Sequence, residues 1–158
     1  MILFSMLPLL TADQIQAIET QDIAKLSTAQ IRAIETGDLE KLSADQIKAI
    51  NTAAIATLTT DQIKSLTEEQ IQALTTDQIS RLSTVQLGVL SGQQVKAIET
   101  ADIAVLSNKQ LASISTDGIA AMSDEQIAGL STSQISGLTT DQVKALTIDQ
   151  IKAIETAD

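Results

Sequence analysis

The strongest constraint on the fold of this chain is an aliphatic residue at every eighth position, kept in register from Leu10 to Ile154. A second aliphatic series of the same period starts at Ile15, three residues before the next member of the first series. The 158 residues are in effect one octapeptide, close to LTTDQIKA, repeated about nineteen times. We number the octad from the first series, so that Leu10 is position 1, Gln14 is position 5 and Ile15 is position 6. Such self-similarity is typical of repeat proteins, in which each unit packs on its neighbours.

The octad period excludes a continuous helix and a regular strand. Eight residues of an α-helix turn the chain by about 800°, so an apolar stripe would shift by about 80° in each repeat. In a strand, aliphatic residues separated by three and by five positions would point to opposite faces. The Ala, Gln, Lys and Glu residues between them favour helix. We therefore predict an all-α fold, a helical solenoid of very short helices with one helix in each octad.

Position 2 of the octad predicts where each helix starts. It is Ser, Thr or Asn in fifteen of nineteen octads, and thirteen of those fifteen carry Gln at position 5. This spacing is that of a capping box, in which the hydroxyl accepts a hydrogen bond from the position 5 N–H and the Gln side chain accepts one from the cap N–H. We expect these residues to be structural caps. The clearest pairs are Thr11 with Gln14, Ser27 with Gln30, Thr59 with Gln62 and Thr139 with Gln142.

The other four octads replace this pair by Glu at position 2 and Asp at position 5. The coupled change indicates that positions 2 and 5 are in contact. Each of these octads also has Thr at position 3, which we expect to act as an alternative cap one residue later. The four sets are Glu19, Thr20 and Asp22; Glu35, Thr36 and Asp38; Glu99, Thr100 and Asp102; and Glu155, Thr156 and Asp158.

An alternation of period sixteen in the first third of the chain favours two short helices in each coil of the solenoid. There IETQDIAK and IETGDLEK alternate with LTADQIQA, LSTAQIRA and LSADQIKA, and the alternation fades after Asn51. We expect residues 10–158 to form one continuous solenoid domain, part of a longer array. Residues 1–9 are expected to be a degenerate apolar repeat that caps it, because Ile2 and Leu7 keep the octad register.

The apolar first repeat also predicts self-association. An uncapped solenoid end exposes core residues, so a segment of this kind covers the end of its own stack or pairs with another chain. We expect the contact to involve Ile2, Leu3, Phe4 and Leu7. The segment is too short to cross a bilayer and lacks the basic leading region of a signal peptide, so we expect no membrane span.

The composition leaves few groups for catalysis or for cofactors. The chain has no His, Cys, Trp or Tyr, so it lacks the imidazole base of nucleophilic triads and the thiolate and imidazole ligands of most metal sites. Acidic pairs such as Asp124 and Glu125 fall at positions 3 and 4, where acids suit the N-terminus of a helix. We therefore predict that the protein is not an enzyme and has no cofactor and no metal site.

The charge of the chain restricts its partners. Ten basic and twenty acidic residues give a net charge of −10, which disfavours nucleic acid and anionic membranes. A second functional hypothesis is therefore a protein-binding array that engages a partner along its side, although the lack of Trp and Tyr anchors argues against it. A third follows from Thr at position 3 in twelve of nineteen octads, which predicts a hydroxyl ladder that binds ice or glycans.

The strings LTTDQIKSL, LTTDQISRL, LTTDQVKAL and LSTAQIRAIET resemble the octapeptide L[ST]xxQIxx repeat arrays of very large bacterial exoproteins, often labelled as haem-utilisation or adhesion proteins. The resemblance covers residues 10–158. It implies an extracellular or cell-surface location, whereas the absence of Cys is compatible with the cytosol as well. Haem binding is not expected without His, Cys or Tyr. Our leading functional prediction is structural: an elongated spacer or stalk segment of a bacterial surface or secreted protein.

Overall fold

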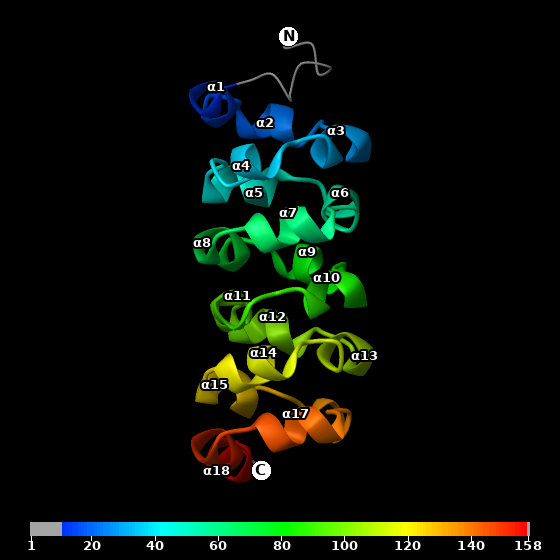
Figure 1. Cartoon of the computed structure of the whole chain (residues 1–158), viewed down its shortest axis with the longest axis vertical. Coiled ribbons are helices and arrows are strands. Elements are labelled where there is room, and N and C mark those ends of the chain that lie inside the picture. The colour runs from blue at the N-terminus through cyan, green and yellow to red at the C-terminus, as the bar shows by residue number, and fades with distance from the viewer. Residues whose placement is uncertain (1–10, 158) are drawn as a thin grey trace. The chain divides into compact units, whose positions relative to one another are not determined.

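The computed structural model describes residues 11–157, and all regular secondary structure within them is helical. These residues form eighteen helices, each starting eight residues after the one before it (Figure 1). The predicted all-α class with one short helix in each octad is confirmed. The helices are α1 (Ala12–Gln16), α2 (Thr20–Ile23), α3 (Thr28–Arg32), α4 (Thr36–Leu39), α5 (Ala44–Ala49), α6 (Thr52–Ile55), α7 (Thr60–Ser65), α8 (Glu68–Gln72), α9 (Thr76–Ser80), α10 (Thr84–Gly88), α11 (Gly92–Ala97), α12 (Thr100–Ala104), α13 (Asn108–Leu111), α14 (Thr116–Ala121), α15 (Asp124–Ala128), α16 (Thr132–Ser136), α17 (Thr140–Ala145) and α18 (Ile148–Ala157).

The chain divides into two compact units, residues 1–82 and residues 83–158. The described part of the first unit holds α1 to α9, and that of the second holds α10 to α18. The boundary separates Leu82 at position 1 from Ser83 at position 2 of the same octad, so no change in the repeat marks it. The assignment of residues 10–158 to one continuous domain stays a prediction.

Each helix is short because both of its ends are built into the octad. The position 2 residue has an extended backbone, as at Thr59 with φ −70° and ψ 161°, and its hydroxyl accepts a hydrogen bond from the Gln62 N–H. The last turn closes at position 1, as in α7, where the N–H of the C-cap Leu66 donates to the Ile63 carbonyl at 3.3 Å, an i to i−3 bond. The next residue, Thr67, is again a cap. One octad therefore contains the start, the end and the next start of a helix.

The two aliphatic series form the core of each unit. Position 6 side chains are 0–1% exposed from Ile15 to Ile127, and position 1 side chains are 2–7% exposed from Ile18 to Leu130. Burial of one such side chain stabilises the fold by about 1.5–3 kcal/mol. A helix of four to six residues cannot bury these side chains alone, so the core is made between coils.

The coils are wider than the alternation in the sequence suggested. Helices in contact are three apart in order, for example α2 with α5 and α4 with α7 in the first unit, and α11 with α14 and α15 with α18 in the second. The expectation of two helices in each coil is therefore wrong. The chain turns only partly at each extended cap, and more than two octads are needed before it returns over itself. The alternation of octad types therefore reflects two ways of starting a helix. Its period of sixteen residues is not the length of a coil.

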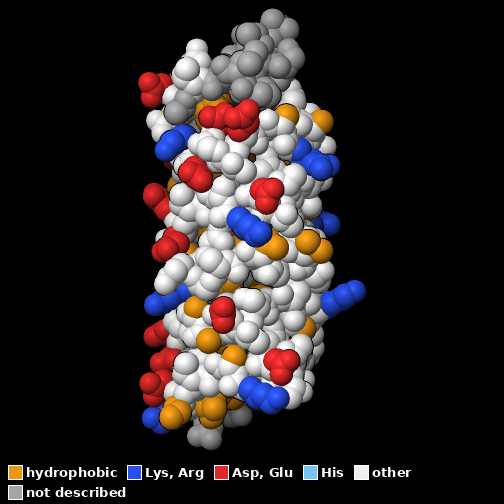
Figure 2. Space-filling view, viewed as in Figure 1, with side chains coloured by type: hydrophobic (Ala, Val, Ile, Leu, Met, Phe, Trp, Pro, Cys, Tyr) orange, Lys and Arg blue, Asp and Glu red, His pale blue; other side chains and the backbone are white. Residues whose placement is uncertain are grey.

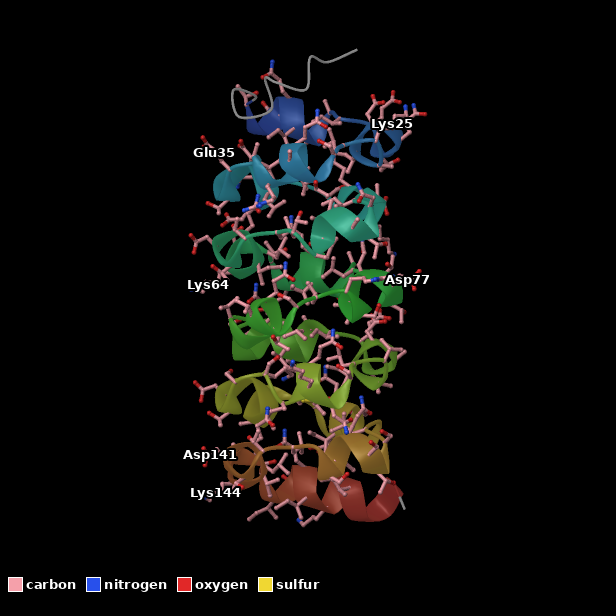
Figure 3. All side chains as sticks on the ribbon, turned by 90° about the vertical axis from the view of Figure 1, so that its right-hand side faces the viewer. Lys25, Glu35, Lys64, Asp77, Asp141 and Lys144 are labelled. Atoms are coloured by element: carbon pink, nitrogen blue, oxygen red, sulfur yellow. The ribbon has the colours of Figure 1, made fainter. Side chains whose placement is uncertain are left out.

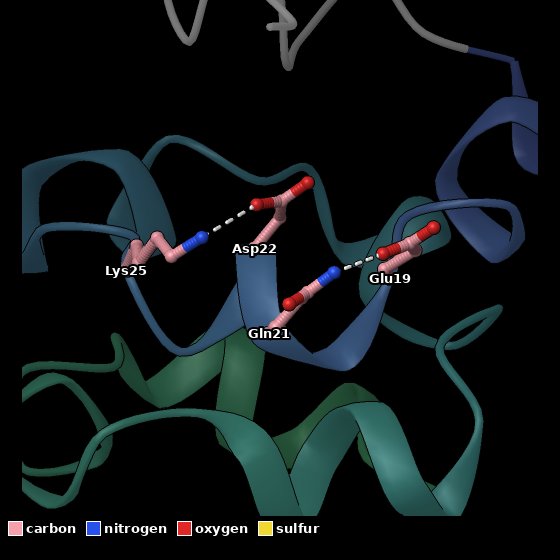
Figure 4. Close-up of polar contacts among 4 residues, drawn as sticks. All are labelled: Glu19, Gln21, Asp22 and Lys25. Carbon is pink, nitrogen blue, oxygen red and sulfur yellow. Dashed lines mark hydrogen bonds and ion pairs between the residues drawn. The ribbon is translucent and has the colours of Figure 1, made fainter.

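The octads with Glu at position 2 start their helices differently from our expectation. The helices α2, α4 and α12 begin at the Thr of position 3, so Glu is the N-cap, and its side chain accepts no capping hydrogen bond from the backbone of the helix. The prediction that Thr caps these helices one residue later is wrong. Around α2 the side chains have other partners: the Asp22 carboxylate pairs with Lys25 at 3.1 Å, and the Gln21 amide donates to the Glu19 carboxylate (Figure 4).

The last helix departs from the eight-residue pattern. α18 continues through Ile154 and past Glu155, where the octad predicts a new helix start. The prediction that every octad restarts its helix is wrong at this point. Because Glu provides no side-chain cap at the start of α2, α4 or α12, the local signal for a restart is weakest in octads of this type.

The contribution of the caps can be measured by a matched pair of substitutions in the first unit. Ser43→Ala should lower the free energy of unfolding by about 1 kcal/mol, because its hydroxyl accepts a hydrogen bond from the Gln46 N–H at 3.2 Å. Glu35→Ala removes a cap side chain that makes no such bond, and should change it by less than about 0.5 kcal/mol. Urea denaturation followed by circular dichroism measures both. Equal losses in the two variants would contradict the difference between the two cap types.

Candidate functional site

The described residues hold no cluster of side chains of the kind that metal binding requires. Among them, no group of three or more Asp or Glu side chains is placed to hold an ion, and the chain has neither His nor Cys. The acidic residues Asp124 and Glu125 lie in the first turn of α15. The pKa of Glu125 is lowered, first by a hydrogen bond from its own backbone N–H and then by one from the Ser123 side chain. These acids stabilise a helix start, and the distinctive chemistry of the octad lies at position 5.

The predicted cap residues come together in reciprocal pairs at the starts of their helices. Thr11 Oγ1 accepts a hydrogen bond from the Gln14 N–H at 3.4 Å, and Gln14 Oε1 accepts one from the Thr11 N–H at 2.9 Å. The same two bonds measure 3.3 and 2.8 Å for Ser27 with Gln30, 3.2 and 3.0 Å for Thr59 with Gln62, and 3.2 and 2.9 Å for Thr139 with Gln142.

The position 5 glutamines have a second set of contacts that we did not predict. While Gln62 Oε1 accepts the cap bond, Gln62 Nε2 donates to carbonyl oxygens four octads earlier. The acceptors are Ile31 at 3.0 Å, Arg32 at 3.3 Å and Ile34 at 2.9 Å. These carbonyls lie at the C-terminal end of α3, where helical carbonyls no longer find partners inside the helix. One side chain thus caps the N-terminus of its own helix and the C-terminus of a helix in the coil below.

The contact recurs in both units with a fixed spacing. The Nε2 atom donates to the carbonyls 31 and 28 residues earlier, over distances of 2.6–3.2 Å. Within each unit a helix packs on the third helix before it, and these glutamines reach the end of the fourth, so one coil takes between three and four octads. The glutamines with these bonds are Gln46, Gln62, Gln70 and Gln78 in the first unit and Gln126, Gln134, Gln142 and Gln150 in the second.

The glutamines that link coils have buried side chains, and the glutamines that only cap the N-terminus of their own helix do not. The eight linking side chains are 1–4% exposed. Gln14 is exposed and Gln30 is half-buried, and no described residue accepts a hydrogen bond from either side-chain amide. Throughout the described residues, no buried side-chain nitrogen or oxygen lacks a partner. A buried polar group is tolerated when it is fully hydrogen-bonded, and the glutamine amide meets that condition at both of its atoms.

The sequence did contain a signal for this contact. A capping box accepts Glu as well as Gln, yet position 5 is Gln thirteen times and never Glu in a chain that is otherwise acidic. Of these two residues only Gln can accept a hydrogen bond at one atom and donate at the other, because the ionised carboxylate of Glu only accepts. The target of the donor could not be predicted, because it lies about four octads away and depends on the width of the coil.

One octad without glutamine keeps the amide donor by another route. Ala54 occupies position 5, and Asn51 replaces Ser or Thr at position 2. Asn51 Oδ1 accepts a hydrogen bond from the Ala54 N–H at 2.9 Å, and Asn51 Nδ2 donates to the Leu26 carbonyl at 2.9 Å. A glutamine at residue 54 would donate to the carbonyl 28 residues earlier, which is the carbonyl of Leu26. The cap and the link to the coil below are therefore both retained.

This equivalence predicts a loss and a rescue. Asn51→Ser should lower the free energy of unfolding by about 1–3 kcal/mol, because serine keeps the cap but leaves the buried Leu26 carbonyl without its side-chain donor. Adding Ala54→Gln to the same chain should recover most of that loss, since Ser with Gln is the combination of the other octads. Chemical denaturation of the two variants and the parent chain measures the recovery. A double variant no more stable than the single one would show that the two donors are not equivalent.

The charged side chains lie on the outer surface, where acidic and basic groups are interspersed (Figure 2). The ion pairs Asp141–Lys144 at 3.6 Å and Asp149–Lys152 at 3.3 Å are exposed. Pairs of this kind contribute only about 0.2–0.5 kcal/mol each. Figure 3 shows six charged side chains that point away from the ribbon: Lys25, Glu35, Lys64, Asp77, Asp141 and Lys144.

An open groove lies in the first unit between the start of α2 and α5. Its lining includes Glu19, Gln21, Ser43 and Asp45. Two carboxylates in an open groove are well hydrated, and no buried side chain there is left without a partner. The groove therefore offers no chemistry beyond that of the surrounding surface.

The residues expected to mediate self-association, Ile2, Leu3, Phe4 and Leu7, lie outside the described residues, as does the degenerate repeat at residues 1–9. Both assignments stay predictions. None of the described helices is long and apolar enough to cross a membrane.

Comparison with known families identifies the repeat. Residues 31–68, 95–132 and 127–156 match the family model described as the ALTTAQ repeat, and together these stretches cover more than half of the chain. No curated protein matches the sequence. The match confirms that the chain is a repeat array. The labels of haem-utilisation and adhesion proteins stay predictions.

Proposed function

Because the chain belongs to the ALTTAQ repeat family, we propose that it is a non-enzymatic structural repeat segment, an elongated spacer or stalk of a bacterial surface or secreted protein. The observation that supports this most is how the octad uses its recurrent side chains. Positions 1 and 6 fill the core, and the glutamines at position 5 link coils. A solenoid held together in this way lengthens when octads are added, without redesign of its core. That property suits a spacer.

Small-angle X-ray scattering of the purified chain tests the elongated part of this proposal. A compact protein of this length has a radius of gyration of about 15 Å. A spacer should give a clearly larger value, and a cross-section that stays constant when further octads are appended. A radius of gyration near the compact value would contradict an elongated spacer.

The location needs a separate experiment. Antibodies against the repeat should label intact cells that produce the full-length protein, without permeabilisation. Signal only after permeabilisation would contradict the surface or secreted role, and would leave the spacer geometry as a separate result.

A protein-binding array is the second candidate, supported by the excess of acidic over basic side chains on a chain of net charge −10. A basic partner would be steered to such a surface by long-range attraction. A pull-down that recovers one partner at equal stoichiometry, and loses it when exposed acids such as Asp77 and Asp141 are changed to Lys, would favour this role over the spacer.

A hydroxyl-ladder surface for ice or glycans is the third candidate. Thr20 and Thr36, at position 3, are exposed first residues of their helices. Thermal hysteresis or glycan binding that disappears when the position 3 threonines are replaced by Lys would support it.

A further inference from the structure

One joint between coils in the second unit lacks the side-chain amide donor that the other joints have. Within a unit, where both residues are described, the carbonyl at position 1 that lies 28 residues before a position 5 residue accepts a hydrogen bond from a side-chain amide, with one exception. The exception is Leu90, and the residue 28 positions after it is Gly118. The carbonyls that do have a donor belong to Ile18, Leu26, Ile34, Leu42 and Ile50 in the first unit and to Ile98, Leu106, Ile114 and Met122 in the second.

No described group replaces the missing donor. Leu90 is 3% exposed, and no described residue donates a hydrogen bond to its carbonyl. The space at Gly118 is filled by carbon, because an added Cβ would lie 2.7 Å from Ile114 Cγ2 and 3.1 Å from Val95 Cγ2. A position 5 side chain could not begin there unless Ile114 moved. The Leu90 carbonyl is therefore a buried acceptor without a partner, which destabilises the closed joint.

The two helices at this joint approach each other closely. α14 packs on α11 (Figure 1), and a Cβ added at Gly92 would lie 2.9 Å from Ala121 Cβ and 3.3 Å from the Asp117 carbonyl oxygen. This contact fills space left by two residues without side chains, but it supplies no donor for the Leu90 carbonyl. A gap of about 0.5–1 Å already removes a quarter to a half of such a dispersion contact, so the contact is lost after a small separation.

From these contacts we infer that the start of α14 is a built-in opening point of the second unit, where the coils separate more readily than at the start of α15. At α15, Gln126 donates to the carbonyls of Val95 at 3.2 Å and Ile98 at 2.6 Å, so opening there breaks side-chain hydrogen bonds. Opening at the start of α14 breaks no bond of this kind. The inference does not depend on the proposed spacer function. In a spacer under tension, this joint would lengthen before the joint at α15.

Native-state hydrogen exchange followed by NMR tests the inference in the parent chain. The Ile119 N–H in α14 and the Ile127 N–H in α15 are equivalent probes, because both residues are 0% exposed and each N–H bonds to the carbonyl of its own N-cap, at 2.9 and 3.0 Å. Each helix lies between two coils, since α14 contacts α11 and α17, and α15 contacts α12 and α18. The protection factor of Ile119 should be about tenfold lower than that of Ile127, although α15 is nearer the C-terminal end.

A single substitution should close the joint. Ser115→Asn keeps an oxygen that can accept the cap bond from the Gly118 N–H. The new amide would lie 25 residues after Leu90, the spacing at which the Asn51 amide donates to the Leu26 carbonyl. The protection factor of Ile119 should rise by about tenfold, and that of Ile127 by less than about threefold.

Ser123→Asn is the matched control. It makes the same change at the same position one octad later, but the carbonyl 25 residues earlier is that of Ile98, which already accepts a hydrogen bond from Gln126 at 2.6 Å. This variant should change the protection of Ile119 and Ile127 by less than about threefold.

Three results would each overturn the inference. The first is equal protection of Ile119 and Ile127 in the parent chain. The second is a Ser115→Asn chain in which the protection of Ile119 does not rise. The third is a rise of the same size at Ile127, because the substitution would then stabilise the whole unit and not one joint. A compact radius of gyration would contradict the spacer function and leave these exchange rates unaffected.

Discussion

Ile127→Ala should lower the free energy of unfolding of the second unit by about 2–5 kcal/mol, the range for large-to-small changes in a packed core. Ile127 is at position 6 of its octad and is 0% exposed. Removal of its side chain leaves a cavity between coils, where helices too short to fold alone depend on each other. The loss should therefore be large for a single substitution in a chain of this size.

Ile151→Ala is the matched control, because it makes the same change at the same octad position. Its side chain is 46% exposed, so much of the stabilisation by burial is already absent, and the expected loss is below about 1 kcal/mol. Guanidinium denaturation followed by circular dichroism gives both values. Similar losses in the two variants would contradict a core made between coils.

Gln126→Glu is expected to be highly disruptive for a conservative change, with a loss of about 3 kcal/mol or more at neutral pH. Glutamate can still accept the cap bond from the Ser123 N–H, which Gln126 Oε1 accepts at 2.8 Å. It cannot donate to the carbonyls of Val95 at 3.2 Å and Ile98 at 2.6 Å, and it places a buried charge beside them. The capping box survives this substitution, and the link between coils does not.

Two comparisons separate this effect from a loss of capping. Gln14→Glu makes the same change in a capping box whose glutamine is exposed, and should alter stability by less than about 0.5 kcal/mol. Burial beside carbonyls should also raise the pKa of the new carboxyl at position 126 above its unfolded value. The folded variant then holds its proton to higher pH than the unfolded one, so its loss of stability grows as the pH rises from about 4 toward 7. A loss that is independent of pH, or equal in the two variants, would contradict the role of Nε2.

Much of the fold could be predicted from the octad because the relevant signals are local. The period of the aliphatic residues excludes one long helix, and the Ser or Thr three residues before Gln gives most of the helices their start. Both follow from geometry within about one turn of helix. Thr59, Gln62 and Ile63 could therefore be assigned their places without knowledge of the coil.

The remaining features depend on distant parts of the chain. The width of a coil is set by how far the chain turns at each extended cap, and the octad sequence does not encode that angle in a recognisable way. The acceptors of Gln62 lie 28–31 residues earlier, so they could not be identified before the coil was known. The start of the helix in the Glu octads was predicted wrongly from a local signal. Thr20 is a residue type that favours the N-cap, but in the structure it is the first residue of α2.

In both units the position 5 glutamine donates its side-chain amide to the preceding coil. Hydrogen exchange of the side-chain amide protons, followed by NMR, tests it most directly. The protons on Nε2 of Gln126 and Gln134 should exchange on the order of 100-fold more slowly than those of Gln14, since they are released only when coils separate. Exchange of all three at the rate of a free glutamine amide would contradict a link between coils through Nε2.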